Sequence, residues 1–202
     1  YLWAQAVQTS RTGVPMMRAM VLEFRDPPCR FLDTQYMLGE SLLVAPIFNP
    51  QGIAGYYVPE GTWLDFFTGK PVEGGHSYKN KYDYFSLPLL VRPNTLLAVG
   101  NDIRNVVYDY AKDVTLHLVQ LEDGGVAECT VYTANGSADL TAEATRTGNT
   151  VTIQTKGHKP FTVLLRNLSE AASVSGASVV STPKGLQLTP HVLSGTITVQ
   201  LK

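Results

Sequence analysis

The stretch GVPMMRAMVLEF (residues 13–24) decides what we expect at the start of this chain. A Gly-Val-Pro break precedes the nearly continuous apolar run MMRAMVLEF (residues 16–24), which is typical of a strand covered on both faces. The preceding residues 1–12 are rich in helix formers, and Gly13 stands where a helix would be capped. The apolar residues on one face of that helix are Leu2, Ala6 and Val7. This order of helix, loop and buried strand predicts the end of an α/β domain.

The remainder of the first 44 residues continues this pattern. RDPPCRFLDTQYMLG (residues 25–39) predicts a Pro-Pro loop and then a short helix built on Phe31, Leu32, Gln35 and Tyr36. SLLVAPIF (residues 41–48) predicts a second apolar strand. All four methionines precede residue 40, and we interpret them as core-filling side chains rather than as a metal or cofactor site.

A β pattern begins at about residue 45. IAGYYVPEGTWLDFFTG (residues 53–69) contains two strand-like runs around Pro59-Glu60-Gly61, which predicts a hairpin. Further strands follow in residues 82–100, where Pro88 and Pro93 indicate edge positions or bends.

From about residue 106 the chain becomes richer in Thr, Ser, Ala and Val. Nine short strands are expected, in VVYDY (106–110), VTLHLVQL (114–121), VAECTVYT (126–133), ADLTAEAT (138–145), TVTIQTKG (150–157), FTVLLRN (161–167), ASVVS (177–181), GLQLTP (185–190) and TITVQLK (196–202). Tight reversals are predicted at Asp123-Gly124, Asn135-Gly136 and Gly148-Asn149. Short strands with frequent turns are typical of a β-sandwich, so the chain as a whole is expected to be mainly β.

Bulk composition excludes several classes of protein. The 202 residues carry a net charge of −1, with basic and acidic residues mixed along the chain, so neither nucleic acid nor a membrane surface is an expected partner. The apolar runs are too short to span a bilayer. Cys29 and Cys129 are interpreted as buried thiols of a reducing compartment, with a disulfide as the alternative.

A search for catalytic and metal-binding motifs finds no convincing site. None of the histidines has the spacing of a metal ligand, and His117 is expected to face solvent or to make a local hydrogen bond. VSGASV (174–179) and LSGTIT (193–198) do not match the nucleophile elbow of a hydrolase, and EDGGVAE (122–128) does not match a phosphate-binding loop. The four histidines are His76, His117, His158 and His191.

Acidic and aromatic residues leave two further questions open. Glu23 follows an apolar strand, which is where an α/β barrel places catalytic groups, but no partner carboxylate has a motif around it. We therefore favour a structural role, as a cap or a salt-bridge member, for the early carboxylates Glu23, Asp26, Asp33 and Glu40. A sugar-binding platform or, preferably, a hydrophobic core is expected from the aromatic residues Tyr56, Tyr57, Trp63, Phe66, Phe67, Tyr82, Tyr84 and Phe85.

Four of these stretches together resemble the C-terminal third of glycoside hydrolase family 31, and most closely its bacterial α-xylosidases. They are GVPMMRAMVLEFRDPP (13–28), QYMLGESLLVAPIF (35–48), YYVPEGTWLDFFTG (56–69) and SLPLLVRPNTLLAVG (86–100), and RTGNTVTI (146–153) adds to the likeness. The resemblance implies a fold of two antiparallel β-sandwich domains preceded by the last α/β elements of a (β/α)8 barrel. Residues 1–44 would end the catalytic barrel, 45–105 would form a proximal sandwich and 106–202 a distal one.

The family resemblance also implies a function. Members are retaining α-glycosidases that use two aspartates, and the nucleophile motif Lys-Thr-Asp-Phe-Gly-Glu does not occur in this sequence. We therefore expect a segment of an enzyme acting on terminal α-xylosides or α-glucosides that has no catalytic, cofactor-binding or metal-binding residues and needs no cofactor. The isolated chain is expected to be inactive.

The resemblance implies two partners, which are the upstream barrel and, through the whole enzyme, an oligosaccharide substrate. Whether the protein also forms a homo-oligomer is left open. Because the sequence starts at Tyr1 without an initiator Met or a signal-like segment, we expect residues upstream. The expected protein is cytoplasmic and, in keeping with the resemblance to bacterial α-xylosidases, bacterial. The alternative is a free-standing pair of β-sandwiches that binds carbohydrate or another protein.

Overall fold

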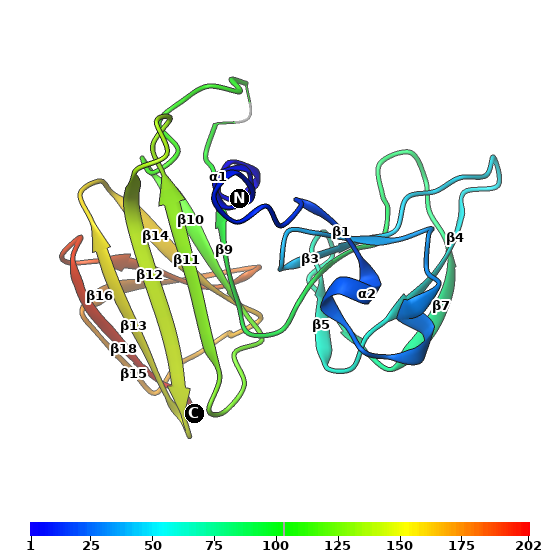
Figure 1. The fold of residues 1–202 in the computed structure, drawn as a ribbon. Coiled ribbons are helices and arrows are strands. Elements are labelled where there is room, and N and C mark those ends of the chain that lie inside the picture. The colour runs from blue at the N-terminus through cyan, green and yellow to red at the C-terminus, as the bar shows by residue number, and fades with distance from the viewer. Residues whose placement is uncertain (103) are drawn as a thin grey trace. The chain divides into compact units, whose positions relative to one another are not determined.

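The computed structural model describes residues 1–102 and 104–202, and its contacts divide the chain into two compact units (Figure 1). We call Gln8–Pro93 the proximal unit, and Tyr1–Val7 together with Asn94–Lys202 the distal unit. The division falls within helix α1 (Leu2–Thr12). These contact units differ from the three domains expected from the sequence, whose boundaries at residues 44/45 and 105/106 remain predictions.

Helix α1 confirms the helix predicted over residues 1–12, and it ends at Gly13 as expected. The Gly13 N–H donates a hydrogen bond to the Thr9 carbonyl over 2.9 Å, and Gly13 adopts a φ of 73°. This left-handed conformation is a common way to end a helix and favours glycine, which has no Cβ to clash.

The apolar run that follows does not form the single strand expected over residues 16–24, so that prediction is wrong. Strand β1 covers only Met17–Ala19, and the helical turn α2 (Met20–Glu23) follows it. Within this turn Met20 is buried whereas Val21 and Leu22 are exposed. Periodicity cannot distinguish a short strand from a helical turn in so short an apolar run. Strand β1 also pairs antiparallel with its neighbour, whereas adjacent strands of a (β/α)8 barrel run parallel. The barrel elements expected in residues 1–44 are therefore not found in the described part of this chain.

The short helix predicted around residues 31–36 is also wrong. A 3₁₀ turn, η1 (Pro27–Arg30), precedes it in the chain, and Tyr36 begins a strand. The two prolines supply the fixed φ of the first turn but cannot continue a helix, since they lack an N–H. The apolar strand predicted over residues 41–48 is confirmed over its first part, where Leu42–Val44 form a strand with all three side chains buried.

The proximal unit is built from a six-stranded antiparallel sheet and a separate pair of strands. The sheet has the order β1-β2-β3-β8-β5-β6, formed by Met17–Ala19, Tyr36–Leu38 (β2), Leu42–Val44 (β3), Leu89–Val91 (β8), Thr62–Asp65 (β5) and Pro71–Glu73 (β6). The pair consists of β4 (Ile53–Val58) and β7 (His76–Lys81). Their shared core includes Met20, Met37, Leu43, Val58, Trp63 and Leu90.

Strands β4 and β5 do not form the hairpin predicted around Pro59-Glu60-Gly61, although both strand predictions are correct. Strand β4 pairs with β7, and β5 pairs with β6 and β8, so the turn connects different sheets. The Trp63 indole N–H donates to the Pro59 carbonyl over 2.9 Å, which anchors the turn to the core. The turn chemistry is right for a reversal, but the pairing partners come from later in the chain.

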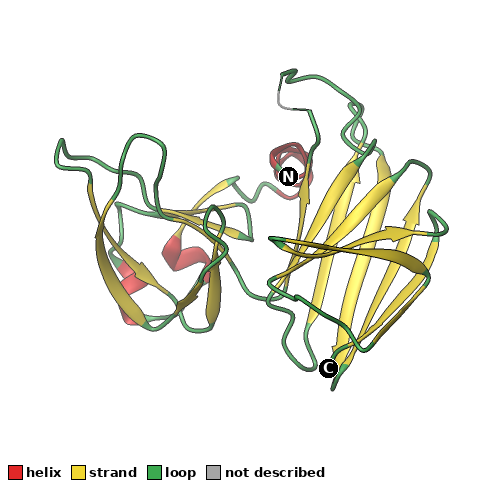
Figure 2. Cartoon of the chain, turned by 180° about the vertical axis from the view of Figure 1, so that it is seen from behind, coloured by secondary structure: helices red, strands yellow, loops and turns green. Residues whose placement is uncertain are grey.

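The distal unit is a sandwich of two five-stranded sheets, and helices are few in the whole chain (Figure 2). The order β16-β17-β14-β10-β9 is formed by Ala177–Thr182, Gly185–Pro190, Phe161–Arg166, Val114–Val119 and Thr95–Val99. The order β11-β12-β13-β18-β15 is formed by Val126–Tyr132, Ala138–Thr147, Thr150–Gly157, Gly195–Gln200 and Ser173–Ser175. The predicted β-sandwich is confirmed. Its pairs are antiparallel except for β10 and β14, which run parallel.

Most local predictions for the distal unit are correct. Eight of the nine expected strands are found. Residues 106–110 form an irregular, bent segment instead of the ninth strand, and Ser173–Ser175 form a strand that we did not predict. The reversals at Asn135-Gly136 and Gly148-Asn149 join paired strands, as predicted. Asp123-Gly124 instead joins β10 to β11, which belong to different sheets, so the hairpin predicted there is wrong.

The core of the distal unit lies between the two sheets, because alternate residues of each strand point inward. Inward-facing residues that are almost completely buried include Leu116, Val163 and Leu188 of one sheet and Ala144, Ile153 and Val199 of the other. Each large aliphatic side chain buried in this way contributes about 1.5–3 kcal/mol through removal of apolar surface from water.

Candidate functional site

The proximal unit contains an ion-pair network centred on Glu23, at the end of α2. Its Oε1 lies 2.6 Å from Nη1 of Arg18 on β1, and its Oε2 lies 3.1 Å from Nη1 of Arg92, directly after β8. Arg18 also donates from Nε to the Pro15 carbonyl, and the Arg92 guanidinium lies 4.7 Å from the centre of the Phe24 ring. Both carboxylate oxygens of Glu23 are thus occupied by guanidinium groups, as in a structural clamp.

We call the network of Arg18, Glu23 and Arg92 the Glu23 clamp, and it joins segments that are far apart in the sequence. Arg18 and Glu23 have side chains only 10% and 17% exposed, so the charges are partly removed from water and depend on one another. Arg92 also reaches the Glu40 carbonyl, over 3.3 Å. The salt-bridge role favoured for Glu23 is therefore confirmed.

The other three early carboxylates have different surroundings. Asp26 precedes η1, and its Oδ2 accepts a hydrogen bond of 2.9 Å from the hydroxyl of Tyr57. Burial, followed by the hydrogen bond to Asp26, raises the pKa of Tyr57 to about 12. The side chains of Asp33 and Glu40 are exposed. Asp26 is thus bound by a tyrosine hydroxyl and Glu23 by two guanidinium groups, so the two carboxylates have different partners.

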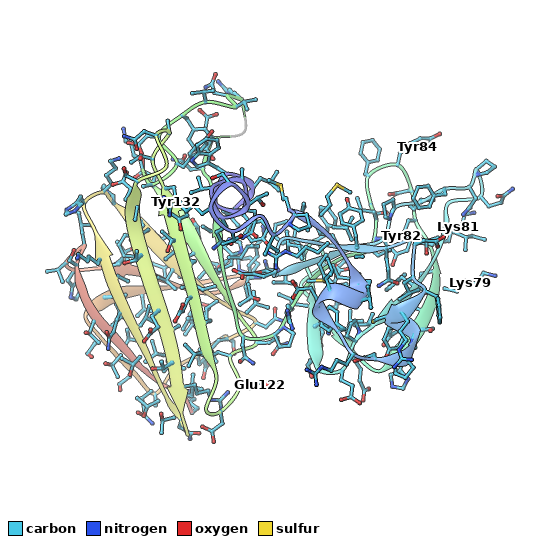
Figure 3. All side chains as sticks on the ribbon, in the orientation of Figure 1. Lys79, Lys81, Tyr82, Tyr84, Glu122 and Tyr132 are labelled. Atoms are coloured by element: carbon cyan, nitrogen blue, oxygen red, sulfur yellow. The ribbon has the colours of Figure 1, made fainter. Side chains whose placement is uncertain are left out.

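The aromatic residues of the proximal unit fall into a buried group and an exposed group. Tyr56, Tyr57 and Trp63 are buried, so the core interpretation is confirmed for them. Tyr84 and Phe85 are almost fully exposed in the loop between β7 and β8, and Figure 3 shows Tyr84 projecting from that loop. Phe67 is also exposed, at 51%, whereas Phe66 and Tyr82 are half-buried. The rings of the aromatic set that could meet a ligand are therefore those of Phe67, Tyr84 and Phe85.

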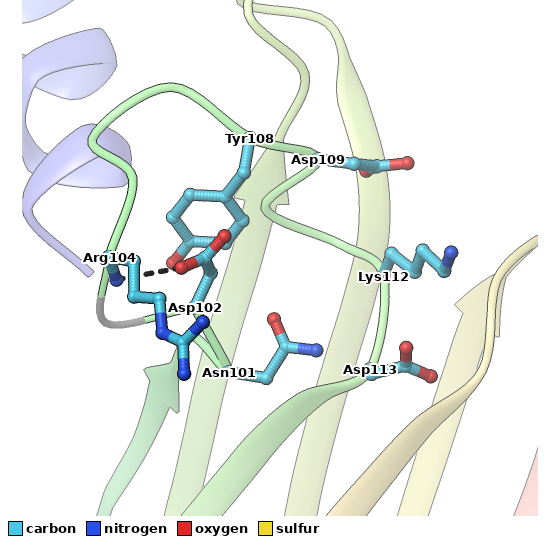
Figure 4. A pocket seen from close by; sticks show the side chains of 7 residues that line it. All are labelled: Asn101, Asp102, Arg104, Tyr108, Asp109, Lys112 and Asp113. Carbon is cyan, nitrogen blue, oxygen red and sulfur yellow. Dashed lines mark hydrogen bonds between the residues drawn. The ribbon is translucent and has the colours of Figure 1, made fainter.

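The distal unit contains an open pocket of about 530 Å³ that the sequence search did not single out (Figure 4). It is lined by Asn101, Asp102, Arg104, Tyr108, Asp109, Lys112 and Asp113. Tyr108 packs so closely on Gly100 that a Cβ there would lie 1.7 Å from the tyrosine oxygen. No motif in the sequence marks the pocket, because its residues come from irregular loop positions.

The carboxylates of this pocket are held by local hydrogen bonds. Asp102 Oδ2 accepts a hydrogen bond of 2.8 Å from the Asn105 side chain, and its Oδ1 accepts from the backbone N–H groups of Arg104 and Asn105 over 2.7 and 3.1 Å. The bond from the Asn105 side chain, followed by the two backbone bonds, lowers the pKa of Asp102. Asp109 pairs with Lys159 over 3.0 Å. The pocket offers donors, acceptors and an aromatic wall, which suit a polar ligand such as a sugar. A carboxylate with a lowered pKa is not suited to act as a general acid.

Of the four histidines, His117 is buried, whereas His76, His158 and His191 are exposed. His117 on β10 is buried, and its Nδ1 accepts a hydrogen bond of 3.2 Å from Nη1 of Arg166, since a guanidinium can only donate. Of the two environments expected for His117, the structure therefore shows the local hydrogen bond. Cys29 and Cys129 are both free thiols, and Cys29 is buried as predicted, whereas Cys129 is only partly buried. Within residues 1–102 and 104–202, no group of three or more His, Cys, Asp or Glu side chains could hold a metal ion, and no helix is long and apolar enough to cross a membrane.

Comparison with protein families gives two matches that together cover most of the chain. Residues 13–97 match the glycosyl hydrolase family 31 C-terminal domain, and residues 109–201 match the C-terminal domain of the α-xylosidase YicI. The chain belongs to glycoside hydrolase family 31. Its residues correspond to the C-terminal portion of the family's proteins, as the resemblance implied.

Curated relatives in family 31 include three α-xylosidases. The α-xylosidase XylQ of Lactiplantibacillus pentosus is 36% identical over 162 residues, which are 78% of this chain and 21% of the relative. An α-xylosidase of Emericella nidulans is 41% identical over 109 residues, which are 50% of this chain and 14% of the relative. The chain thus spans about a fifth or less of the curated relatives that it matches.

Solved structures of family 31 share the fold. A family 31 dextranase of Flavobacterium johnsoniae matches 99% of this chain and 31% of its own length, with a TM-score of 0.82 and 17% identity. At this identity the likeness supports the arrangement of strands and says nothing about the substrate.

Proposed function

We propose that the chain is the C-terminal segment of a retaining α-glycosidase that removes terminal α-xylosyl, or α-glucosyl, residues from oligosaccharides. The observation that carries the proposal is the pair of family matches, which together reach from residue 13 to residue 201. The three α-xylosidases among the curated relatives support the xyloside as the preferred substrate. In this proposal the two catalytic aspartates belong to an upstream barrel, and the present chain is inactive by itself.

The proposed partner of the proximal unit is the catalytic barrel of the same protein. Around β1, α2 and η1 the unit exposes a group of large apolar side chains, and exposed groups of this kind often mark an interface. They are Met17, Val21, Leu22 and Phe31. The relatives are several times longer than this chain, so an occupant for this surface would be supplied by the rest of such a protein. The Glu23 clamp would hold the surface in shape, because it fixes α2 to β1 and to the end of β8.

A carbohydrate-binding module is the second candidate, and it rests on a different observation. The exposed rings of Tyr84 and Phe85 and the polar pocket of the distal unit are features that could contact sugars. In that case the isolated chain would bind oligosaccharides directly.

An assay of two proteins tests the proposal. One is the present chain, and the other is extended upstream to the start of its reading frame. We expect the extended protein to hydrolyse p-nitrophenyl α-xyloside faster than the α-glucoside, with retention of configuration by NMR, and the present chain to hydrolyse neither. A start codon directly before Tyr1, together with calorimetric binding of xylo-oligosaccharides by the chain alone, would overturn the enzyme proposal in favour of the binding module.

A further inference from the structure

Strand β16 (Ala177–Thr182) differs from the other edge strands in the described part of the chain. Unpaired sheet edges invite association, and natural proteins usually blunt them with charges, prolines, short strands or a covering segment. Strands β1, β6 and β15 are three residues long, and β6 also contains Pro71 and Glu73. Strand β7 carries Lys79 and Lys81, and β11 carries Glu128. Most residues of β4 and β9 are buried.

None of these protective features is found in β16. It has six residues of sequence Ala-Ser-Val-Val-Ser-Thr, without charge or proline, and it forms the end of its sheet beside β17. The run Ser178–Ser181 is exposed, with Val179 at 41% and Val180 at 62%. Residues 178–181 of this strand therefore form a regular edge that is open to another strand.

The hydrogen-bonding pattern shows which backbone groups of β16 face outward. The His191 N–H donates to the Gly176 carbonyl over 2.9 Å, so Gly176 faces the β17 side of the strand. In an antiparallel ladder this orientation alternates, so the N–H and C=O groups of Val179 and Ser181 point away from β17. Pro190 lies opposite Ala177, and this pair is not hydrogen-bonded in the same alternation. Pro190 therefore needs no N–H to donate to β16.

We propose that β16 pairs antiparallel with β16 of a second copy of this chain, joining two sandwiches edge to edge about a twofold axis. A twofold axis perpendicular to the joined sheet leaves each side chain on the same face of the sheet. Residues that lie opposite each other in an antiparallel pair also share a face, so the axis must pass beside one residue, which then lies opposite its own copy. If the axis passes beside Val180, Val179 of each copy lies opposite Ser181 of the other copy. Val179 and Ser181 are both exposed. Centring on Val179 would instead require Ala177, which is buried.

The charge and shape of β16 favour a second copy over an unrelated partner. Around a twofold axis every charge lies near its own copy, so a charged strand would repel itself, whereas β16 is uncharged. Val180, the more exposed of the two valines, would meet Val180 of the second copy in a non-hydrogen-bonded pair, where side chains lie closest. The inference does not depend on the proposed enzymatic function, since it uses only the edge geometry of the distal unit.

Engineered cysteines test both the pairing and its register. Residue 180 would have a Cα about 4.5 Å from its copy, within disulfide range, so Val180→Cys should form a covalent dimer under mild oxidation. Residues 179 of the two copies would be offset by two positions and lie about 8 Å apart, so Val179→Cys should form at least about tenfold less dimer. The unmodified chain controls for Cys29 and Cys129. Absence of the Val180→Cys dimer, or equal dimer from both variants, would overturn the proposal.

Sedimentation of the chain provides the second test. We expect the unmodified chain to form a dimer in a concentration-dependent way, and Val180→Lys to be monomeric because two lysines would face each other. Val126→Lys, at an exposed valine on β11, is the matched control and should still dimerise. A monomeric unmodified chain, or an oligomer that Val180→Lys leaves unchanged, would contradict the inference. Circular dichroism checks that both variants are folded.

Discussion

The side chain of Gln35 pairs with the backbone of Tyr57 as another strand would. Its Nε2 donates to the Tyr57 carbonyl over 2.8 Å, and its Oε1 accepts from the Tyr57 N–H over 2.7 Å. Both bonds are buried, and Gln35 itself is 3% exposed. A single amide therefore satisfies the donor and the acceptor of one residue of β4, which would otherwise be left without partners inside the core.

Replacement of Gln35 by leucine should destabilise the proximal unit strongly. Leucine has a similar size but leaves the Tyr57 N–H and C=O unpaired, and each buried unpaired group costs about 1–3 kcal/mol. We expect a loss of about 2–4 kcal/mol in the free energy of unfolding, measured by urea denaturation. Gln51→Leu, at an exposed glutamine, should change it by less than about 0.5 kcal/mol. Equal effects of the two substitutions would show that the Gln35 bonds contribute nothing.

The Glu23 clamp should act on stability. Glu23→Gln removes the charge that two arginines share, and the partly buried position places the expected loss at about 1–3 kcal/mol, between surface and buried ion pairs. Glu40→Gln, at an exposed carboxylate, is the control and should be close to neutral. The measurement is urea denaturation at neutral pH. A variant as stable as the unmodified chain would refute the structural role of Glu23.

Stability should depend on pH through His117. Burial, and then the charges of Arg166 and Lys184, lower the pKa of His117 to about 4, whereas an unfolded histidine has a pKa of about 6.5. Between these values the unfolded state binds more protons, so the contribution of His117 to stability is present above pH 6.5 and falls as the pH is lowered toward 4. Relative to His117→Gln, the unmodified chain should lose up to about 3 kcal/mol across this range.

The measurement for His117 is urea denaturation of both proteins at several pH values. Glutamine keeps an acceptor for Arg166, and all other titrating groups are shared, so the difference between the two curves isolates the histidine. A difference that stays constant from pH 7 to pH 4 would contradict the prediction.

Both cysteines should be protected in the folded chain. Burial raises the pKa of the Cys29 thiol to about 11 and that of Cys129 to about 12, and only the thiolate form reacts. We expect iodoacetamide at pH 8 to label either residue at least about a hundredfold more slowly in the native chain than in urea, as followed by mass spectrometry. Rapid labelling of one cysteine in native buffer would show that its segment opens to solvent.

Local signals predicted the first helix and most strands of the distal unit, but they failed for the strand expected over residues 16–24 and for the helix expected around residues 31–36. Helix α1 ends at Gly13, the strands of the distal unit follow the period-two alternation, and Asn135-Gly136 and Gly148-Asn149 reverse the chain between paired strands. Wherever a prediction needed the identity of a distant partner, it failed. Asp123-Gly124 has the same turn chemistry but connects two sheets, and β4 pairs with β7 rather than with β5.

The Glu23 clamp shows the same limit at the level of the candidate site. The residue type and its place after an apolar run allowed a catalytic or a structural role. Arg92 is 69 positions away in the sequence and has no motif that links it to Glu23. The pocket around Tyr108 was missed for a related reason, since loop residues with mixed polarity follow no period.

The sequence by itself determined the mainly β class, the helix at the start, most strands of the distal sandwich and the resemblance to glycoside hydrolase family 31, because these depend on side-chain periodicity and on short stretches of residues. The tertiary structure alone decided which strands pair, which carboxylates are bound by arginine and which edge stays open. Those features depend on contacts between residues far apart in the chain, and backbone hydrogen bonds between strands carry almost no signature of the side chains that they join.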